Sequence, residues 1–333
     1  MDRRQFLGAS AATLLASQPS WAQQRQFFRI GTGGISGTYY PIGGLIADIV
    51  SKPSGSRPCD RGGDCGVPGL VALAQTSLGS VANIRAIIAQ EIESGFAQSD
   101  IAYGAFAGSG VFAGEPPASD LRAIANLYPE SMHLLVSAES GIKSVGDLRG
   151  KRVSLDELGS GTLVDALLLL GAYNIGVSDI QAVNVKPGVA IGMMQDGEID
   201  ALFVIAGYPA SSVMELIDTI GAQLVPIAGP ETDKLLEQRP FFTPGTIPAA
   251  AYGLPEDTAT LNVGAQWLTS LRADEELIYQ LTRTLWSDYA RATLDSGHPK
   301  GQEITLETAL DGIAVPLHPG AARYYRERRM IVH

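Results

Sequence analysis

The sequence is poor in the side chains from which catalytic and metal centres are usually built. Its 333 residues include two cysteines and four histidines, and no H-E-x-x-H segment or comparable metal-ligand spacing occurs. The histidines are scattered, and His298 and His318 each precede a proline in an apparent loop. We therefore expect structural or surface roles for the histidines. We also expect a protein that carries no metal or cofactor and is not an enzyme.

Basic residues and long apolar runs are also scarce. Lys and Arg number 24 against 35 Asp and Glu, which gives a net charge of −11 at pH 7. This balance argues against nucleic acid or an anionic membrane as a partner, although a few local donors would suffice for an acidic ligand. Beyond the amino terminus, nothing approaches the roughly 18 apolar residues of a membrane span. A length of 333 residues exceeds what a single core usually supports, so we expect two lobes.

Two common enzyme motifs are incomplete. A dinucleotide-binding fingerprint would continue Gly31-x-Gly33 with a third glycine at position 36, where the chain has Ser36. A nucleophile elbow around that serine would need a glycine two residues later, and Thr38 stands there. The sequence therefore predicts neither a dinucleotide-binding site nor a nucleophile elbow in this segment.

Residues 1–22 have the pattern of an export signal. Arg3 and Arg4 precede apolar residues, as in a twin-arginine signal, and small residues precede an expected cleavage site after Ala22. An ordinary Sec signal is the alternative, and it leads to the same compartment. We therefore expect a mature protein in the periplasm.

The two cysteines, Cys59 and Cys65, lie in the segment RPCDRGGDCGVPG. In an oxidising compartment they are expected to form a disulfide that closes a small loop. Zinc is the alternative, but only Asp60 and Asp64 are nearby, and the usual third and fourth ligands are missing.

Residues 27–44, FFRIGTGGISGTYYPIGG, predict a short strand, a glycine-rich loop and the start of a helix. Backbone N–H groups at such a turn face an anion well, with the helix dipole behind them. The alternative is a tight turn that needs its glycines only for geometry. The candidate ligand contacts in this stretch are Thr32, Gly33, Gly34, Gly37, Tyr39 and Tyr40.

Three later segments also place small polar groups at predicted strand ends or helix starts. In open α/β sheets these positions lie at the carboxyl ends of the strands, where ligands bind. Each segment alone could be a plain helix cap, but together they favour a binding cleft for a small anion. Their candidate contacts are Ser80 and Asn83, then Gln98 and Ser99, then Ser160, Gly161 and Thr162.

The alternation of strand and helix patterns predicts α/β lobes with mainly parallel strands. Ser80 is expected to be a helix N-cap. Among the less regular segments, we expect a strand over residues 95–103, separate strands over 121–128 and 133–136, a proline-rich loop over 241–249 and a helix over 266–271.

Several segments in order resemble one known family. The chain is similar over residues 27–325 to the TAXI family, the substrate-binding proteins of TRAP transporters, and especially to the members called 31 kDa immunogenic proteins. The segments that carry the resemblance are RIGTGGISGTYYPIGG, GSVANIRAI, GFAQSDIAY, LYPESMHLLV, GIKSVGDLRGKRVSLDELGSGT and VPLHPGAARYY.

The resemblance implies a type II periplasmic binding protein, an α/β fold whose two lobes close by a hinge. It places lobe 1 in residues 23–130 and 245–333, and lobe 2 in residues 131–244. It implies a monomer that captures a small carboxylate, glutamate-like or a 2-oxoacid, for a TRAP membrane subunit with fused small and large components. It also adds Tyr128 and Tyr208 to the candidate cleft residues.

Two features depart from the family pattern. The insert around Cys59 and Cys65 is absent from many relatives, so its role cannot be inherited, and a twin-arginine signal is not something the fold requires. The alternative functions are an exported periplasmic enzyme loaded with a cofactor, and a ligand sensor or surface antigen.

Overall fold

The computed structural model describes residues 26–331; the expected signal peptide and its cleavage site lie outside these residues. The strands are β1 (Gln26–Gly31), β2 (Ser51–Lys52), β3 (Val67–Pro68), β4 (Leu70–Gln75), β5 (Ser94–Gln98), β6 (Leu121–Val136), β7 (Arg152–Ser154), β8 (Gln181–Val183), β9 (Ala201–Ala206), β10 (Gln223–Leu224), β11 (Phe242–Ile247) and β12 (Thr258–Ser270). The α-helices are α1 (Tyr39–Val50), α2 (Ser80–Ile88), α3 (Ser99–Ala107), α4 (Gly161–Ala172), α5 (Pro187–Gln195), α6 (Ser211–Ile220), α7 (Pro230–Gln238), α8 (Glu275–Leu285), α9 (Asp288–Gly297) and α10 (Pro319–Glu327).

Ten of these strands form one mixed sheet, ordered β4-β1-β5-β12-β6-β9-β7-β8, with β10 paired to β6 and β11 paired to β12. At one end of the sheet β1 is parallel to β4 and β5, and at the other end β7 is parallel to β8 and β9. In the centre β12 is antiparallel to β5 and β6, and β6 is antiparallel to β9. The expectation of mainly parallel strands is therefore wrong for the centre. Long antiparallel strands replace helical crossovers there, and they carry the chain from one lobe to the other.

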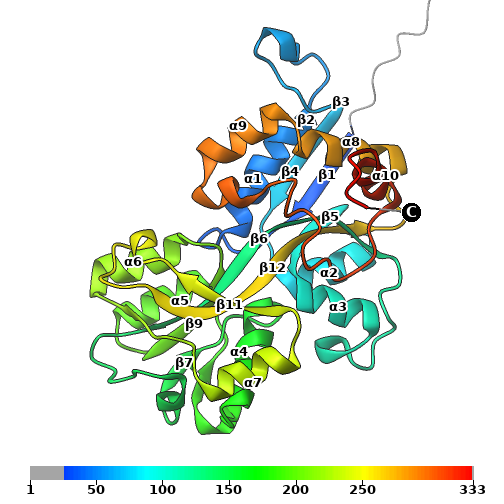
Figure 1. Cartoon of the computed structure of the whole chain (residues 1–333). Coiled ribbons are helices and arrows are strands. Elements are labelled where there is room, and N and C mark those ends of the chain that lie inside the picture. Colours follow the sequence, from blue (N-terminus) through cyan, green and yellow to red (C-terminus); the bar gives the residue numbers. More distant parts are fainter. Residues whose placement is uncertain (1–25, 332–333) are drawn as a thin grey trace, which may run out of the picture.

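Figure 1 shows the two lobes, with β6 and β12 running between them. The first lobe packs β1, α1 and the carboxyl-terminal helices α8, α9 and α10 around one apolar cluster, which includes Phe28 and Trp267. In the second lobe, α4, β7 and β9 pack around another cluster, which includes Leu169 and Phe203. The α/β fold of two lobes is therefore confirmed.

The lobe boundaries stay a prediction. Leu261 and Val263 pack in the second lobe's cluster, and Ile247 and Tyr252 pack in a further cluster with α5 and α6. This packing favours a return to the first lobe after residue 263 rather than at residue 245.

Four local predictions are wrong, and tertiary packing explains the first two. Residues 266–271 lie mostly in β12, a central strand that is buried on both faces and so lacks the alternation of a half-buried strand. Residues 242–247 form β11, which tolerates Pro244 because it pairs with β12 alone. The predicted strand over 95–103 ends at Gln98, where α3 begins one residue later. The two strands predicted over 121–136 are one strand, β6.

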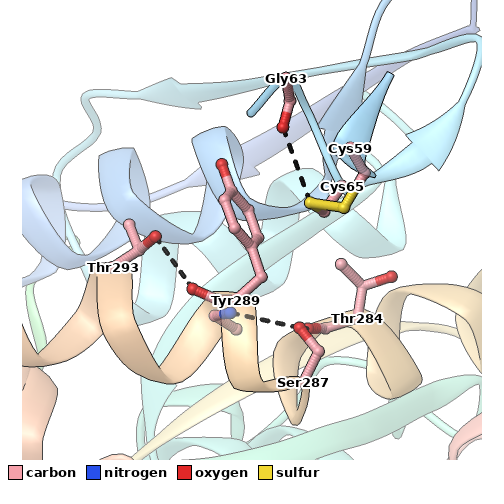
Figure 2. Close-up of a disulfide and its surroundings, with 8 residues drawn as sticks. Cys59, Gly63, Cys65, Thr284, Ser287, Tyr289 and Thr293 are labelled. Atoms are coloured by element: carbon pink, nitrogen blue, oxygen red, sulfur yellow. Dashed lines mark hydrogen bonds between the residues drawn. A yellow bond between two sulfur atoms is a disulfide. The ribbon is translucent and has the colours of Figure 1, made fainter. Parts of the chain in front are cut away.

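Cys59 and Cys65 form the expected disulfide, so the zinc alternative is excluded. The bond closes a short loop that contains the 3-10 helix η1 (Cys59–Arg61), between β2 and β3. Figure 1 shows this loop projecting from the first lobe at its end remote from the second lobe, and Figure 2 shows the disulfide near Tyr289 in α9. The insert thus lies far from the boundary between the lobes.

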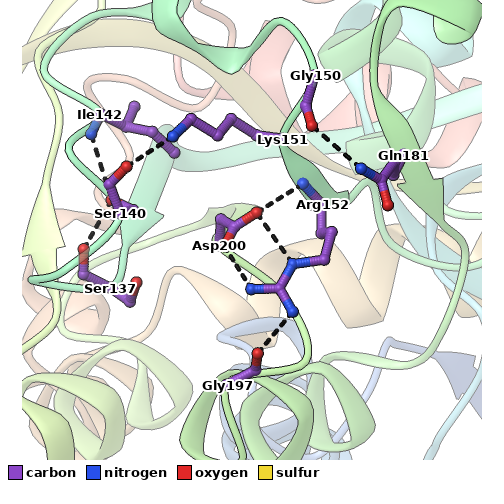
Figure 3. Close-up of polar contacts among 9 residues, drawn as sticks. All are labelled: Ser137, Ser140, Ile142, Gly150, Lys151, Arg152, Gln181, Gly197 and Asp200. Carbon is purple, nitrogen blue, oxygen red and sulfur yellow. Dashed lines mark hydrogen bonds and ion pairs between the residues drawn. The ribbon is translucent and has the colours of Figure 1, made fainter.

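An ion pair holds β7 beside β9 in the second lobe (Figure 3). Arg152 and Asp200 approach to 2.5 Å, the Arg152 backbone N–H also donates to Asp200, and a third bond runs from Arg152 to the carbonyl of Gly197. The bonds from Arg152 hold the pKa of Asp200 below its usual range. This arrangement fixes the strand whose end leads into residues 156–162.

No helix within residues 26–331 has the length and apolarity needed to cross a membrane.

Candidate functional site

A cleft between the lobes collects most of the polar segments predicted from the sequence. Its cavity volume is about 70 Å³, which is room for roughly five to seven water molecules. It lies where the carboxyl ends of β1, β4, β5, β7 and β9 meet, as expected for ligand sites of α/β sheets. The lining residues are Gly33, Gly34, Gly37, Thr38, Tyr39, Leu78, Gly79, Ser80, Gln98, Glu130, Asp156, Glu157, Ser160, Gly161, Thr162, Pro187, Val204, Ile205 and Ser212.

Five helices begin at this cleft, and one of them, α5, starts with Pro187, which has no backbone N–H to offer. The first turns of α1 and α2 belong to the first lobe, and those of α4, α5 and α6 belong to the second. Each start leaves backbone N–H groups without intrahelical partners and adds the positive end of a helix dipole. Ser160 caps α4, because its Oγ accepts from the backbone N–H of Leu163 at 3.1 Å. The N–H groups of Leu163, Ala82 and Ser212 are already used within the protein, and the other N–H groups of these first turns are the neutral donors that the cleft offers to an anionic group.

Ser80 is not the N-cap that the sequence predicts. Gly79, at φ +105°, takes the cap position, and Ser80 is the first residue of α2. Its hydroxyl instead donates to Gln98 Oε1 and accepts from the Gln98 backbone N–H, both at 3.1 Å. Gln98 Nε2 in turn donates to Asp165 Oδ2 in α4 at 3.0 Å. Gln98 therefore links the two lobes at the edge of the cleft.

The sequence reasoning missed an acidic wall. Glu130, Asp156 and Glu157 line the cleft, and the Tyr39 hydroxyl donates to Glu130 Oε2 at 2.6 Å. Burial raises the pKa of Glu130 to about 8, and burial raises the pKa of Asp156 to about 7. Two features of the sequence could have indicated these acids. Glu130 lies inside the apolar run of β6, and Asp156 lies shortly before the glycine turn that leads into α4.

Asp156 also has a strained backbone. Its φ is +74°, a left-handed conformation that costs a non-glycine residue of order 1–3 kcal/mol. Such residues cluster at functional sites, and Asp156 sits where the second lobe faces the cavity. The strain and the raised pKa both mark it as a candidate ligand contact.

No Lys or Arg of the described chain lines the cleft. One cation behind it is Lys300, a fully buried side chain that pairs with Glu303 at 2.8 Å and lies 3.6 Å from the centre of the Tyr208 ring, and another is Lys186, which acts on Glu157. Any negative charge of a ligand would therefore be met by helix starts, hydroxyls and protonated carboxyls.

Nine of the predicted site residues line the cleft, and six do not. Those that line it are Gly33, Gly34, Gly37, Tyr39, Ser80, Gln98, Ser160, Gly161 and Thr162. Those that do not are Thr32, Tyr40, Asn83, Ser99, Tyr128 and Tyr208.

The six remaining residues have other surroundings. Asn83 Nδ2 donates to the carbonyls of Thr32 and Phe96, at 2.6 and 2.8 Å, and so braces the glycine loop from behind. Ser99 and Tyr128 line a separate cavity that β6 and β12 also border. Tyr40 is partly exposed on α1, and Tyr208 stacks under Lys300. A direct role in ligand binding stays a prediction for all of these residues.

The lobes touch on both sides of the cavity. The Ser36 carbonyl accepts from the Ser212 N–H at 3.3 Å and from the Ser211 hydroxyl at 3.1 Å. On another side, the Ala82 N–H donates to the Gly159 carbonyl at 3.0 Å. The structure therefore shows the lobes closed on each other.

A closed cleft between two α/β lobes defines the class of the fold, that of the periplasmic binding proteins. MatC from Rhodopseudomonas palustris, solved with bound malate, matches with a TM-score of 0.52 at 14% identity, over 91% of this chain and 97% of that one. The periplasmic binding protein BugD matches with a TM-score of 0.54 at 10% identity, over 91% and 93% of the two chains. Residues 30–328 match the model of the NMT1-like family, and the chain belongs to that family.

Proposed function

We propose that this protein is the periplasmic substrate-binding protein of a TAXI-type TRAP transporter, which captures a small carboxylate between its lobes. The observation that supports the proposal is the convergence of five helix starts from both lobes on one small cavity. A ligand that contacts both lobes binds the closed state more tightly, and this difference in affinity drives closure.

The chemistry of the cleft divides the ligand into two parts. A carboxylate matches the helix starts and the hydroxyls, each net hydrogen bond contributing about 0.5–3 kcal/mol. The acidic wall suits an ammonium group when it is ionised and an oxo or hydroxyl oxygen when it is protonated. Glu130, with a pKa of about 8, is mostly protonated at pH 7 and suits an oxo oxygen. Asp156, with a pKa of about 7, is ionised in about half of the molecules at that pH and can accept from an ammonium group, so both glutamate-like ligands and 2-oxoacids fit.

The proposal includes a partner and a location. The protein would act as a monomer in the periplasm and pass its ligand to a membrane subunit with fused small and large components. It would have no catalytic role. The malate in MatC belongs to that protein, and it illustrates that this fold accommodates a small carboxylate.

Thermal unfolding with candidate ligands tests the proposal. Ligand binding to the folded state alone raises the melting temperature, and a concentration of 100 times Kd contributes about 2.7 kcal/mol. The sharpest pair of probes is L-glutamate and 2-oxoglutarate, which differ only at the carbon that bears the ammonium or oxo group. A rise with either compound, absent with matched amides, supports a carboxylate cleft, and no rise across amino acids, oxoacids and dicarboxylates contradicts it.

Two further observations separate the alternatives. A flavin or nicotinamide absorbance in the purified protein would contradict the receptor and support a cofactor-loaded enzyme. Genes for TRAP membrane proteins beside this gene would support the transporter over a sensor or surface antigen, whereas a neighbouring signalling receptor would favour the sensor.

A further inference from the structure

Gly33 is a buried residue of the glycine loop, and its backbone N–H has no acceptor within the described chain. Buried N–H groups without an acceptor are rare in folded proteins, because nothing compensates the loss of water. Gly33 lines the cleft, so a ligand in the cavity can supply the missing acceptor. The N–H of Gly34 also lacks an acceptor there, but Gly34 is exposed and water can serve it.

The orientation of the Thr32–Gly33 peptide follows from what its carbonyl contacts. The Thr32 carbonyl accepts from Asn83 Nδ2 at 2.6 Å and from the Ser77 hydroxyl at 2.9 Å, and neither Asn83 nor Ser77 lines the cleft. In a trans peptide such as this one, the C=O and N–H bonds point in opposite directions. The carbonyl is therefore turned into the first lobe, and the Gly33 N–H is turned towards the cavity.

The fold provides a space that fits the side chain of Asn83. This residue of α2 is 1% exposed, and its Nδ2 also donates to the Phe96 carbonyl in β5 at 2.8 Å. Gly31 and Gly95 are partners in the pairing of β1 with β5. A Cβ on Gly31 would lie 2.6 Å from Asn83 Oδ1, and a Cβ on Gly95 would lie 3.1 Å from Asn83 Cβ. The reversed amide would set an oxygen against two carbonyl oxygens, so the hydrogen bonds fix which way Asn83 points.

These side-chain bonds matter because glycine does not fix the peptide by itself. Without a Cβ on Gly33, rotation of the Thr32–Gly33 peptide by about half a turn meets little steric resistance. The rotated peptide would present the Thr32 carbonyl to the cleft, beside the acidic wall, and would repel an anion. It would also leave the donors of Asn83 and Ser77 without their acceptor, which makes the rotation unfavourable.

We infer that Asn83 is a positioning residue, which together with Ser77 turns the Gly33 N–H towards the carboxylate of the bound ligand. Asn83 acts through the Thr32–Gly33 peptide and not by contact with the ligand. The inference rests on the proposed function and deepens it, because it names a donor to the carboxylate in the first lobe and the side chains that orient this donor.

Nuclear magnetic resonance can observe this one peptide. Thr32–Gly33 is the only Thr-Gly pair in the sequence, so protein with a labelled carbonyl carbon in threonine and a labelled nitrogen in glycine gives a single correlated signal. The probes are L-glutamate and 2-oxoglutarate, and calorimetry shows which of them binds. The Gly33 amide proton is expected to move to lower field when the carboxylate accepts from it. Binding that leaves this proton unmoved overturns the inference.

Asn83→Ala removes the bond from Nδ2 to the Thr32 carbonyl. In the ligand-free variant the Thr32 carbonyl carbon is expected to move to higher field, because its oxygen has lost a donor. The affinity for the bound probe is expected to fall about three- to tenfold. An unchanged carbonyl signal or an unchanged affinity overturns the role of Asn83.

Asn126→Ala is the matched control. Asn126 is also a buried asparagine whose Nδ2 donates to a carbonyl, that of Thr308 at 3.3 Å, but it does not line the cleft or contact the glycine loop. The variant should keep the wild-type Thr32–Gly33 signal and the wild-type affinity. The same change of signal in Asn126→Ala would show a general loss of packing and would overturn the assignment to Asn83.

Variants of Gly33 keep the inference testable if Asn83→Ala does not fold. Gly33→Pro removes the N–H itself, whereas Gly33→Ala keeps it, since a Cβ there meets Tyr39 at an ordinary 3.6 Å. We expect Gly33→Pro to bind the probe about tenfold more weakly than Gly33→Ala, and equal affinities overturn the inference. If neither probe binds the wild type, the carboxylate proposal fails, while the carbonyl signal of ligand-free Asn83→Ala still decides whether Asn83 holds the peptide.

Discussion

At the scale of single residues, Glu130 shows how a site acquires acids that are not charged at neutral pH. It lies within β6, only 2% exposed, with Tyr39 donating to one of its oxygens. Burial penalises the ionised form, and the nearby Asp100 adds to the effect, while Tyr39 and Lys300 oppose it. The result is a carboxyl group that serves as donor or acceptor according to pH.

Glu130→Gln should stabilise the protein in alkaline solution. The pKa of Glu130 is about 8 when folded and about 4.3 when unfolded, so its contribution to stability is present at low pH and is lost between these values. We expect the variant to match the wild type at pH 5 and to exceed it by about 2–4 kcal/mol at pH 9, measured by chemical denaturation. The exposed Glu139→Gln is the control and should show no such divergence. Parallel stability curves for Glu130→Gln and the wild type would contradict the assigned pKa.

Gln98 and Ser80 form the polar edge of the first lobe. Gln98→Ala removes the link to Asp165, and Ser80→Ala removes two hydrogen bonds to Gln98. Each variant should weaken binding of the ligand identified by thermal shift by about 1–3 kcal/mol, with little loss of fold stability. Calorimetric titration measures this, with the exposed Ser178→Ala as control. Unchanged affinity in both variants would remove these residues from the site.

At the scale of elements, the turn from β7 to α4 shows why a glycine stands where the lobes meet. A Cβ on Gly161 would lie 1.3 Å from Gln98 Oε1 and 2.9 Å from Ser80 Oγ, both in the other lobe. The glycine thus lets the start of α4 approach the first lobe closely. Glycine is required at position 161 because the lobes are closed on each other, and not because helix α4 itself needs a glycine there.

Gly161→Ala should therefore hold the lobes apart. We expect at least a tenfold loss of ligand affinity in calorimetry, while the melting temperature of the ligand-free protein changes little, because each lobe still packs normally. Gly171→Ala in the same helix is the matched control, since a Cβ there meets nothing within 4 Å. Wild-type affinity in Gly161→Ala would mean that the ligand binds without this closure.

At the scale of the whole molecule, contacts far apart in sequence join the lobes. Lys300 comes from the carboxyl-terminal part of the first lobe, and its ammonium lies over the ring of Tyr208, which follows β9 in the second lobe. Nearby, the Thr38 hydroxyl donates to the Gly207 carbonyl at 2.6 Å. These contacts exist only while the lobes are together.

Lys300→Met should weaken ligand binding because it destabilises the closed state. The loss of the cation–π contact removes up to about 2 kcal/mol from closure, which corresponds to as much as a thirtyfold rise in Kd. We expect the change mainly in the dissociation rate, measured by stopped-flow or surface plasmon resonance. Lys234→Met, on the exposed face of α7, is the control. An equal affinity for both variants would show that Lys300 contributes nothing to closure.

The sequence by itself determined the fold class, the order of most elements and nine of the residues that line the cleft. These follow from local signals, because glycine turns and polar residues at strand ends depend on near neighbours in the chain. The disulfide followed in the same way from two cysteines in an expected oxidising compartment.

Only the tertiary structure decided the antiparallel centre of the sheet, the acidic wall and the link from Gln98 to Asp165 across the lobes. β12 is buried on both faces, so its sequence lacks the period that would have marked it as a strand. Glu130 and Asp165 have raised pKa values because folding removes them from water. Burial and proximity between distant segments exist only after the lobes have packed, and no local pattern contains them.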